Sequence, residues 1–376
     1  AERCFYLLWP DKDTFAMTME SRIDHPTPGP AAVPGPIENG KGRAVQPIAS
    51  ETIDAMAFSA AFDAIVDNIE TVIKGKTDVV RLSLVAILCE GHILFEDVPG
   101  TGKSMLARAI AQSVNATSNR VQCTPDMLPG DITGSSILDT KTSTFEFRPG
   151  PIFTNVLLSD EINRATPKTQ SALLEAMAER RVSVDGVTRD LPRPFLVLAT
   201  QNPVEQAGTF PLPEAQLDRF LFKLSMGYMS RDTEYEVMFD NSVQLSIEDL
   251  GPVIDTSVVR AMIEYATHVE VSPEVGYYMV DLVQASRKDP SVAMGGSPRA
   301  TIALLRAARC LAASDGREHV YPDDVRAVLR PVMAHRIVLN PDAMLRGDSI
   351  DAVLERMTAA VKPPLSARGR SAKAEA

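Results

Sequence analysis

The sequence predicts an α/β fold, in which a parallel sheet has helices on both faces and carries β-hairpin inserts, followed by a smaller α-helical domain. Two observations predict the sheet. Unbroken apolar runs alternate with segments of helical periodicity, a pattern typical of parallel strands that are covered on both faces. Polar residues directly follow these runs, at the strand ends where ligands bind in such sheets. The helical domain is predicted because the apolar runs stop after about Ser230.

Composition restricts the class of protein before any motif is considered. The 376 residues suffice for two domains with buried cores, and 45% of them are hydrophobic. With 38 basic and 49 acidic side chains the net charge is -11, which gives no general attraction to nucleic acids or anionic membranes. No stretch approaches the ~18 apolar residues of a membrane span, so we expect no stable membrane insertion. Four scattered cysteines without metal-ligand spacing indicate free thiols in a reducing cytoplasm.

Both ends of the chain are predicted to lie outside the folded part. Residues 1–50 form a predicted disordered N-terminal tail, because residues 22–50 contain six prolines and four glycines and bury little apolar surface. The chain does not begin with methionine, and we expect translation to start at Met17 or Met19. Residues 362–376 form a predicted C-terminal tail.

Residues 51–230 contain the predicted α/β core. Two helices come first, one from about residue 58 with apolar side chains at spacings of three and four, and one over residues 77–89. The run HILFE is a predicted strand, which a glycine-rich turn and the helix SMLARAIAQSV follow. VLLSDE and FLVLATQN are two further predicted strands.

Two insertions and a second domain complete the predicted organisation. Residues 134–150 and residues 180–192 are each predicted to form a β-hairpin, the second of them turning at Asp185-Gly186. Residues 231–361 form the predicted helical domain, in which the pairs Ser272-Pro273 and Ser297-Pro298 indicate an N-cap followed by proline at the first helical position.

The turn EDVPGTGKS departs by one residue from the phosphate-loop pattern G-x-x-x-x-G-K-[ST], because Asp97 takes the place of the first glycine. The strand before it and the helix after it are the context that a phosphate loop requires. Gly100 and Gly102 would let backbone N–H groups approach phosphate oxygens at the positive end of the helix. Lys103 would reach the β- and γ-phosphates, and Ser104 would ligate Mg²⁺. An ordinary turn with a surface lysine is the alternative that the loop alone leaves open.

The whole predicted nucleotide-binding stretch consists of Asp97, Val98, Pro99, Gly100, Thr101, Gly102, Lys103, Ser104 and Met105. Asp160 and Glu161 end the next predicted strand. We expect Asp160 to hold Mg²⁺ and Glu161 to polarise the attacking water, against the alternative of an acidic pair that only faces solvent. Asn202 ends the third strand, where its amide could hold that water in line; taken alone it would be a loop-capping residue.

Two arginines are further candidates. Arg219 lies in LPEAQLDRF, and Arg299 lies at the second position of a helix in the predicted helical domain. An arginine near a γ-phosphate stabilises transition-state charge. A solvated surface charge is the alternative for either residue, and a structural ion pair is a further one for Arg299.

The sequence resembles the MoxR branch of the AAA+ ATPases. The resemblance lies in LFEDVPGTGKSMLARAIA, in FRPGPIFTNVLLSDEINRATPKTQSALLEAMAER, in ATQNPVEQAGTFPLPEAQLDRF and in SPRA. It implies that residues 100–104 are the Walker A loop and that Asp97 is a family feature. By the same resemblance Asp160 and Glu161 are the Walker B pair, and the remaining matches are sensor 1 (Asn202), the arginine finger on the neighbouring subunit's nucleotide (Arg219) and sensor 2 (Arg299).

The resemblance also implies partners and an activity. Such proteins hydrolyse ATP with Mg²⁺, form homo-oligomeric rings, usually hexamers, and remodel, activate or insert metal into protein clients that often carry a von Willebrand factor A domain. Arg164 matches the family pattern as well and is a second candidate for the subunit interface. The two hairpins resemble inserts that mark the wider clade.

Other functions remain open at this point. A nucleotide-gated scaffold would bind ATP and hardly hydrolyse it, although such a binder would need neither Glu161 nor Asn202. A metal-chelatase motor subunit has a closely related fold. A DNA helicase is disfavoured by the net charge of -11 and by the lack of a basic stripe with interleaved aromatics.

Overall fold

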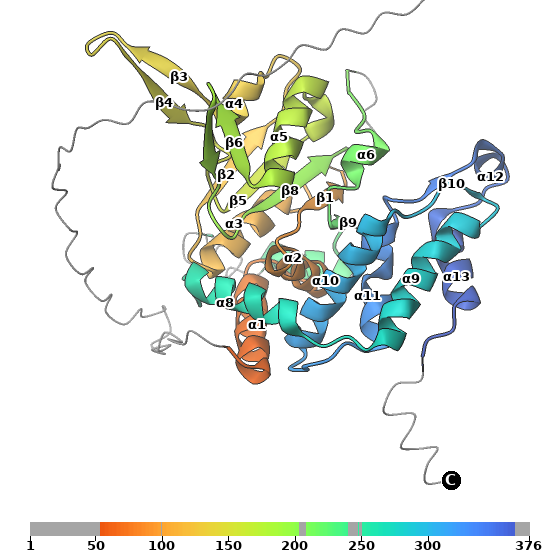
Figure 1. Cartoon of the computed structure of the whole chain (residues 1–376). Helices are drawn as coiled ribbons and strands as arrows, with labels where there is room; N and C mark the ends of the chain where they lie inside the picture. The colour runs from red at the N-terminus through yellow and green to blue at the C-terminus, as the bar shows by residue number, and fades with distance from the viewer. Residues whose placement is uncertain (1–52, 99, 203–207, 240–246, 248–249, 365–376) are drawn as a thin grey trace, which may run out of the picture. The chain divides into compact units, whose positions relative to one another are not determined.

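A computed structural model describes residues 53–98, 100–202, 208–239, 247 and 250–364 (Figure 1). The predicted N-terminal tail, all but the first residues of the predicted C-terminal tail, and Pro99 of the predicted phosphate loop lie outside the described residues. The described part contains an α/β core and a set of helices that follows it, as the sequence predicts.

The core elements are, in chain order, α1 (Ala55–Glu70), α2 (Thr77–Leu88), β1 (Ile93–Glu96), α3 (Lys103–Ser113), β2 (Ser118–Gln122), α4 (Pro129–Thr133), β3 (Gly134–Asp139), β4 (Thr144–Pro149), β5 (Val156–Asp160), the 3₁₀ helix η1 (Ile162–Arg164), α5 (Pro167–Glu179), β6 (Arg181–Val184), β7 (Val187–Asp190), β8 (Leu196–Gln201), α6 (Glu214–Leu217) and β9 (Phe222–Leu224). The later elements are α7 (Arg231–Phe239), α8 (Thr256–His268), α9 (Pro273–Lys288), β10 (Val292–Met294), α10 (Pro298–Ser314), α11 (Pro322–Met333), β11 (Val338–Leu339), α12 (Pro341–Leu345) and α13 (Ile350–Ala360).

Five strands form the central sheet in the order β2-β5-β8-β1-β9, and every neighbouring pair is parallel. The three strands predicted from apolar runs, β1, β5 and β8, are its central members. The sequence did not indicate β2 and β9, which are the edge strands. Only Val121 of β2 is buried, and β9 has three residues, so neither strand produces an unbroken apolar run.

Alternate residues of each central strand pack into opposite layers, which explains why the runs are apolar throughout. Leu158 of β5 and Leu198 of β8 belong to a cluster with α1, α2 and α3, while Leu157 and Val197 belong to a cluster with α5. Because both faces are covered, a polar side chain has no solvated face to occupy within these strands. Polar side chains therefore stand at the carboxyl ends of these strands, where β1 ends with Glu96, β5 with Asp160 and β8 with Gln201.

Both predicted hairpins are present. β3 pairs with β4 and β6 pairs with β7, each antiparallel. The second hairpin turns at Asp185 and Gly186, which both have positive φ values, of 54° and 76°. Glycine and aspartate adopt this left-handed conformation more readily than most residues, as the sequence interpretation required.

The later helices form a lid whose central helix is α10, which packs on α1 and α2 of the core and on α8, α9 and α11. Ser272 and Ser297 cap α9 and α10 as predicted, each with proline in the first turn. The larger apolar cluster runs without interruption from α1 and α2 into α10 and α11. The small ladder of β10 with β11 was not predicted, because it has too few residues for a pattern.

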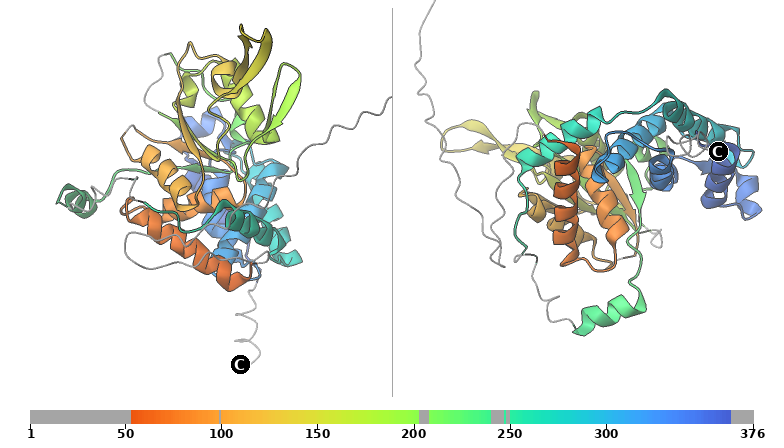
Figure 2. Two further views of the ribbon diagram at one scale, coloured as in Figure 1. Left: turned by 90° about the vertical axis from the view of Figure 1, so that its left-hand side faces the viewer. Right: turned by 90° about the horizontal axis from the view of Figure 1, so that it is seen from below.

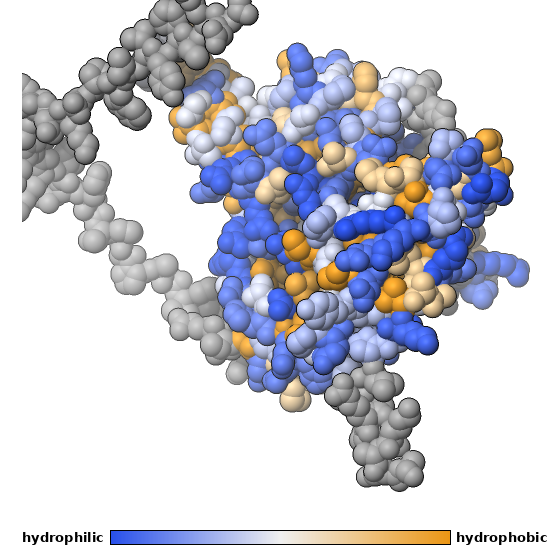
Figure 3. Space-filling view, turned by 45° about the vertical axis from the view of Figure 1, so that its right-hand side comes forward, coloured by the Kyte–Doolittle hydropathy of each residue, from blue (hydrophilic) through white to orange (hydrophobic). Residues whose placement is uncertain are grey.

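The surface agrees with this inward packing. Figure 3 shows the face on which the lid comes forward as mostly hydrophilic, with apolar side chains scattered among polar ones. Figure 2 shows α7, which joins the core to the lid, standing away from the other helices. Among the described residues, no helix has the length and apolar character that crossing a bilayer would require.

We expect the protein to lose stability in mild acid because His92 is buried in neutral form. The Val197 N–H donates to its Nδ1 at 3.1 Å, and its Nε2 lies 3.0 Å from the carbonyl of Met177. Burial lowers the pKa of His92 from 6.5 to about 4. Because the pKa is lowered in the folded protein, protonation of His92 favours the unfolded chain. The free energy of unfolding is therefore unaffected by His92 above pH 6.5 and decreases as the pH falls from 6.5 to 4. The loss is about 3 kcal/mol in total.

Urea unfolding of the wild type and of His92→Gln across this pH range checks the expectation. The free energy of unfolding of the variant is expected to fall less steeply with pH than that of the wild type. His268→Gln is the matched control, because the side chain of His268 is 71% exposed. Equal slopes for the wild type and His92→Gln would contradict the assignment.

Candidate functional site

A cavity of about 430 Å³ lies where β1, β5 and β8 end and α3 begins. The structure brings most of the sequence-predicted site residues together along its wall: Asp97, Gly100, Thr101, Gly102, Lys103, Ser104, Met105, Asp160, Glu161 and Asn202. They converge because the carboxyl ends of neighbouring parallel strands meet at one edge of a sheet. Val98 does not line the cavity but supplies a backbone carbonyl to Lys103.

The loop before α3 depends on its glycines for backbone conformation. Gly100 has φ = 84° and Gly102 has φ = 92°, in the left-handed region that favours glycine. A Cβ at Gly100 would meet nothing within 4 Å, so the conformation, and not a lack of space, requires glycine there. This conformation turns the chain into α3, whose first backbone N–H groups have no partner within the helix.

Lys103 is buried and bonded to its own loop. Its Nζ donates to the carbonyl of Val98 at 2.8 Å and to Thr101 Oγ1 at 3.1 Å. Burial lowers the pKa of Lys103, and the charges of Asp97 and Asp160 act in the opposite direction. A phosphate group could replace these two neutral acceptors and would add negative charge in direct contact with the buried ammonium.

Asp97 stabilises the core by a contact that its sequence position does not reveal. Its carboxylate accepts hydrogen bonds from Ser225 Oγ at 2.7 Å, from the Met226 N–H at 2.6 Å and from the Gly227 N–H at 3.1 Å. A glycine at this place, as in the general loop pattern, would leave these donors without acceptors. Asp97 therefore ties the start of the loop to the chain that leads from β9 towards α7.

We expect Asp97→Ala to lower the free energy of unfolding by about 2–4 kcal/mol, because the buried N–H of Met226 and two partly buried donors lose a charged acceptor. Ser225→Ala is the graded control, since it removes one of the bonds and leaves both backbone N–H groups with their acceptor. Chemical denaturation of the three proteins measures the difference. If the two variants lose the same small amount, the carboxylate does not anchor this segment.

Several donors surround the two acidic residues at the end of β5. Thr200 Oγ1 donates to Asp160 Oδ1 at 3.2 Å and accepts from the Glu161 N–H at 2.9 Å. Arg120 Nε donates to Asp160 Oδ2 at 2.7 Å. Gln122 Nε2 donates to Glu161 Oε2 at 2.9 Å. The sequence interpretation missed Arg120 and Gln122, because β2 had not been recognised as a strand beside β5.

Arg164 Nε also contacts the carboxylate of Glu161, at 3.0 Å from Oε2. Arg164, which we expected at a subunit interface, thus contacts the acidic pair of its own chain. Glu161 itself has φ = 55°, an uncommon conformation for a residue with a side chain. Gln122 Nε2 and Arg164 Nε both contact Oε2 of this carboxylate and so fix its orientation.

The oxygen ligands at this site suit Mg²⁺ if a nucleotide brings phosphates with it. Among the described residues, no group of three or more His, Cys, Asp and Glu side chains could hold a metal ion without other ligands. Mg²⁺ is usually bound by one or two protein oxygens together with phosphates and waters. Ser104 and Asp160, which both line the cavity, are the two such oxygens predicted from the sequence.

A second cavity, of about 410 Å³, lies between the core and the lid. Its wall includes Arg219 and Arg299, neither of which lines the cavity of Lys103. Arg299 Nη1 lies 3.9 Å from Asp218 Oδ2, and Arg219 Nη1 donates to the carbonyl of Leu174. The structure thus does not bring Arg299 to the cavity of Lys103 in this arrangement, in which α10 packs against α1 and α2.

Comparison with known proteins agrees with this description. The ATPase family associated with various cellular activities (AAA) matches residues 92–222, and the AAA lid domain matches residues 284–357. The uncharacterized protein YeaC of Bacillus subtilis is 49% identical over 300 residues, covering 80% of this chain and 94% of that protein. Chaperone MoxR1 of Mycobacterium tuberculosis is 41% identical, covering 79% of this chain and 81% of that protein. A solved structure of a presumed ATPase from Cytophaga hutchinsonii has a TM-score of 0.77 at 34% identity, covering 83% of this chain and 97% of that one.

The sheet order, the glycine-rich loop before α3 and the helical lid define an ATPase of the AAA+ class. Within that class the chain belongs to the MoxR family. The resemblance noted in the sequence is thereby confirmed.

Proposed function

We propose that this protein hydrolyses ATP with Mg²⁺ and uses the hydrolysis to remodel a partner protein. The observation that supports the ATPase most strongly is the single cavity in which Lys103, Asp160 and Glu161 meet at the start of α3. In this proposal residues 51–230 act as the nucleotide-binding core and residues 231–361 as its lid. Both would work in the cytoplasm.

The roles of the cavity residues follow from their positions. The N–H groups of Gly100, Gly102 and the first turn of α3 would hold phosphate oxygens, and Lys103 would exchange its loop acceptors for the β- and γ-phosphates. Ser104 and Asp160 would hold Mg²⁺, which neutralises charge on the phosphates when it is bound. Glu161 would accept the proton of the attacking water, and the amide of Asn202 would orient that water.

The arginines support a ring of identical subunits. Arg219 and Arg299 lie on the second cavity, together with Arg180, Arg306 and Arg336. These five guanidinium groups outnumber the three carboxylates on the same wall, those of Glu90, Glu179 and Asp218. We propose that Arg219 and Arg299 both reach the γ-phosphate of a nucleotide bound by the neighbouring subunit, so that neither site is complete alone. The resemblance to the MoxR family suggests that this ring is a hexamer.

The client is proposed from relatives alone. One relative is named a chaperone, and the family resemblance suggests a partner that carries a von Willebrand factor A domain. Activation of that partner, or insertion of a metal into it, would be the outcome of remodelling. Neither nucleic acid nor a membrane is part of this proposal.

Phosphate release measured across a range of protein concentrations tests the proposal. We expect the rate per subunit to rise with concentration, because each site needs an arginine from a neighbour, and we expect EDTA to abolish it. Phosphate-free buffer blanks and heat-inactivated protein set the background. A rate that stays at background at every concentration would contradict an autonomous ATPase.

A nucleotide-gated scaffold is the second candidate, and one observation favours it. Gln122 Nε2 and Arg164 Nε both contact Oε2 of Glu161, and these contacts hold its carboxylate in one orientation. If a partner never releases these bonds, the protein would bind ATP, assemble and hardly turn over. Tight ATP binding with assembly, but without phosphate release, is the result that distinguishes this candidate.

A further inference from the structure

Arg336, just beyond α11, is buried although it is charged, with a side chain that is 4% exposed. Each N–H of its guanidinium has an acceptor. Nε donates to Asp218 Oδ1 at 2.7 Å, and Nη2 donates to the carbonyls of Asp218 at 3.2 Å and Phe220 at 2.6 Å. Nη1 donates to the carbonyl of Leu221 at 3.2 Å and to that of Val332. All these acceptors but one belong to the core, so a lid residue holds a stretch of core backbone.

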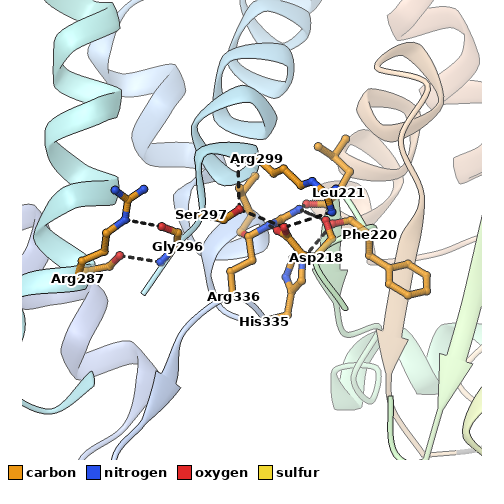
Figure 4. A network of polar contacts seen from close by, with 11 residues as sticks. Asp218, Phe220, Leu221, Arg287, Gly296, Ser297, Arg299, His335 and Arg336 are labelled. Atoms are coloured by element: carbon orange, nitrogen blue, oxygen red, sulfur yellow. Dashed lines mark hydrogen bonds and ion pairs between the residues drawn. The ribbon is translucent and has the colours of Figure 1, made fainter. Parts of the chain in front are cut away.

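Other lid residues bind the same stretch of the core, which we call the 218–221 segment (Figure 4). Ser297 Oγ donates to Asp218 Oδ2 at 3.1 Å, and His335 Nε2 lies 3.0 Å from the carbonyl of Phe220. The carboxylate of Asp218 therefore accepts from two separate parts of the lid, the start of α10 and the end of α11. If the guanidinium of Arg336 were removed, this largely buried carboxylate would keep only Ser297 Oγ and the more distant Arg299 Nη1, at 3.9 Å.

The 218–221 segment contains Arg219, and Asp218 directly precedes it. Beyond the segment, β9 leads to Ser225, Met226 and Gly227, which the carboxylate of Asp97 holds. One short piece of chain is thus fixed to the lid at one end and to the start of the phosphate loop at the other. Any shift of the lid relative to the core must move the backbone that carries Arg219.

We propose that Arg336 is a positioning residue for Arg219. By holding Asp218 and the neighbouring carbonyls, it sets the place at which Arg219 is presented to the neighbouring subunit, and it makes the lid and Arg219 move together. This inference rests on the proposed function, in which Arg219 acts on the nucleotide of the next subunit. Arg336 itself contacts no nucleotide.

Arg336→Met tests the inference, because methionine fills part of the space and removes every donor. We expect turnover to fall by about 10²-fold, the size of effect that a small misplacement of a catalytic group produces, while ATP affinity stays within a factor of about two. Mixing with Lys103→Ala protein is expected to restore turnover well above the sum of the two proteins. In such mixtures an intact pocket of one variant meets a correctly placed Arg219 of the other.

Two further variants keep the test decisive. Asp218→Asn keeps nearly the same shape and removes the charge with which Arg336 pairs. It is expected to lose turnover, and to regain it in mixtures with Lys103→Ala protein, whether or not Arg336→Met folds well. Arg330→Met is the matched control on α11, since the side chain of Arg330 is 68% exposed and pairs with Asp351. It is expected to behave as the wild type.

The outcomes separate this inference from the proposed function. Unchanged turnover in Arg336→Met and Asp218→Asn would overturn the positioning role alone. The same conclusion would follow if Lys103→Ala protein restored turnover to Arg219→Ala protein but not to these two variants. If Lys103→Ala protein does not rescue Arg219→Ala either, the proposal that Arg219 acts on the neighbouring subunit is wrong, and so is the positioning role of Arg336. A thermal melt of each protein identifies a loss that is merely structural.

Discussion

Arg219→Ala is expected to lower ATP turnover by about 10³-fold or more while leaving ATP affinity nearly unchanged. The reason is geometric, because Arg219 lines the second cavity and not the cavity that contains Lys103. Its removal should therefore spare nucleotide binding in its own subunit and remove transition-state charge stabilisation in the next one. Steady-state phosphate release and titration with a fluorescent nucleotide measure the two quantities separately.

Mixing experiments give this prediction its control. Arg219→Ala protein has an intact pocket, and Lys103→Ala protein has an intact Arg219, so mixed rings should contain some complete sites. Arg346→Ala serves as the matched surface variant, since the side chain of Arg346 is 61% exposed, and it should retain the wild-type rate. Mixtures that assemble and yet remain inactive would show that Arg219 does not act between subunits.

Glu161→Gln is expected to reduce hydrolysis by about 10²–10⁴-fold, the usual contribution of a general base. Glutamine keeps the shape of the side chain and can still accept a hydrogen bond from Gln122, so ATP binding and assembly should persist. Single-turnover hydrolysis with excess protein measures the chemical step, and retention of radiolabelled ATP on the protein measures binding.

Glu264→Gln is the control for the loss of one negative charge, because the side chain of Glu264 is 77% exposed and lies in the lid. It should hydrolyse ATP at the wild-type rate. A Glu161→Gln protein that hydrolyses as fast as the wild type would exclude Glu161 as the base. Rates near background in both proteins, together with tight ATP binding, would favour the scaffold.

The central part of the fold could be predicted because its signals are local. β1, β5 and β8 are buried on both faces and therefore produce apolar runs, and the residues that follow them meet at one sheet edge by topology alone. This is why Lys103 and Glu161, which are far apart in the sequence, could be assigned to one cavity before the structure was known.

The rest depends on contacts between residues that are distant in sequence and that no local pattern records. Arg120 and Gln122 lie beside the acidic pair because β2, an edge strand with one buried residue, pairs with β5. Arg336 and Asp218 are separated by 118 residues, and an isolated arginine in a helical segment indicates a surface charge. The placement of Arg299 likewise follows from how α10 packs, which its own sequence does not encode.

The continuous apolar cluster between α1, α2, α10 and α11 limits how this protein can be altered by recombination. A lid that shared no surface with the core could be exchanged between relatives as a module. Here Phe58 and Phe62 of α1 belong to the same cluster as the buried face of α10, so a transplanted lid would have to match their shapes as well as its own interior. Chimeras in this family are therefore constrained at α1, a helix that precedes the nucleotide-binding motifs in the sequence and packs against α3.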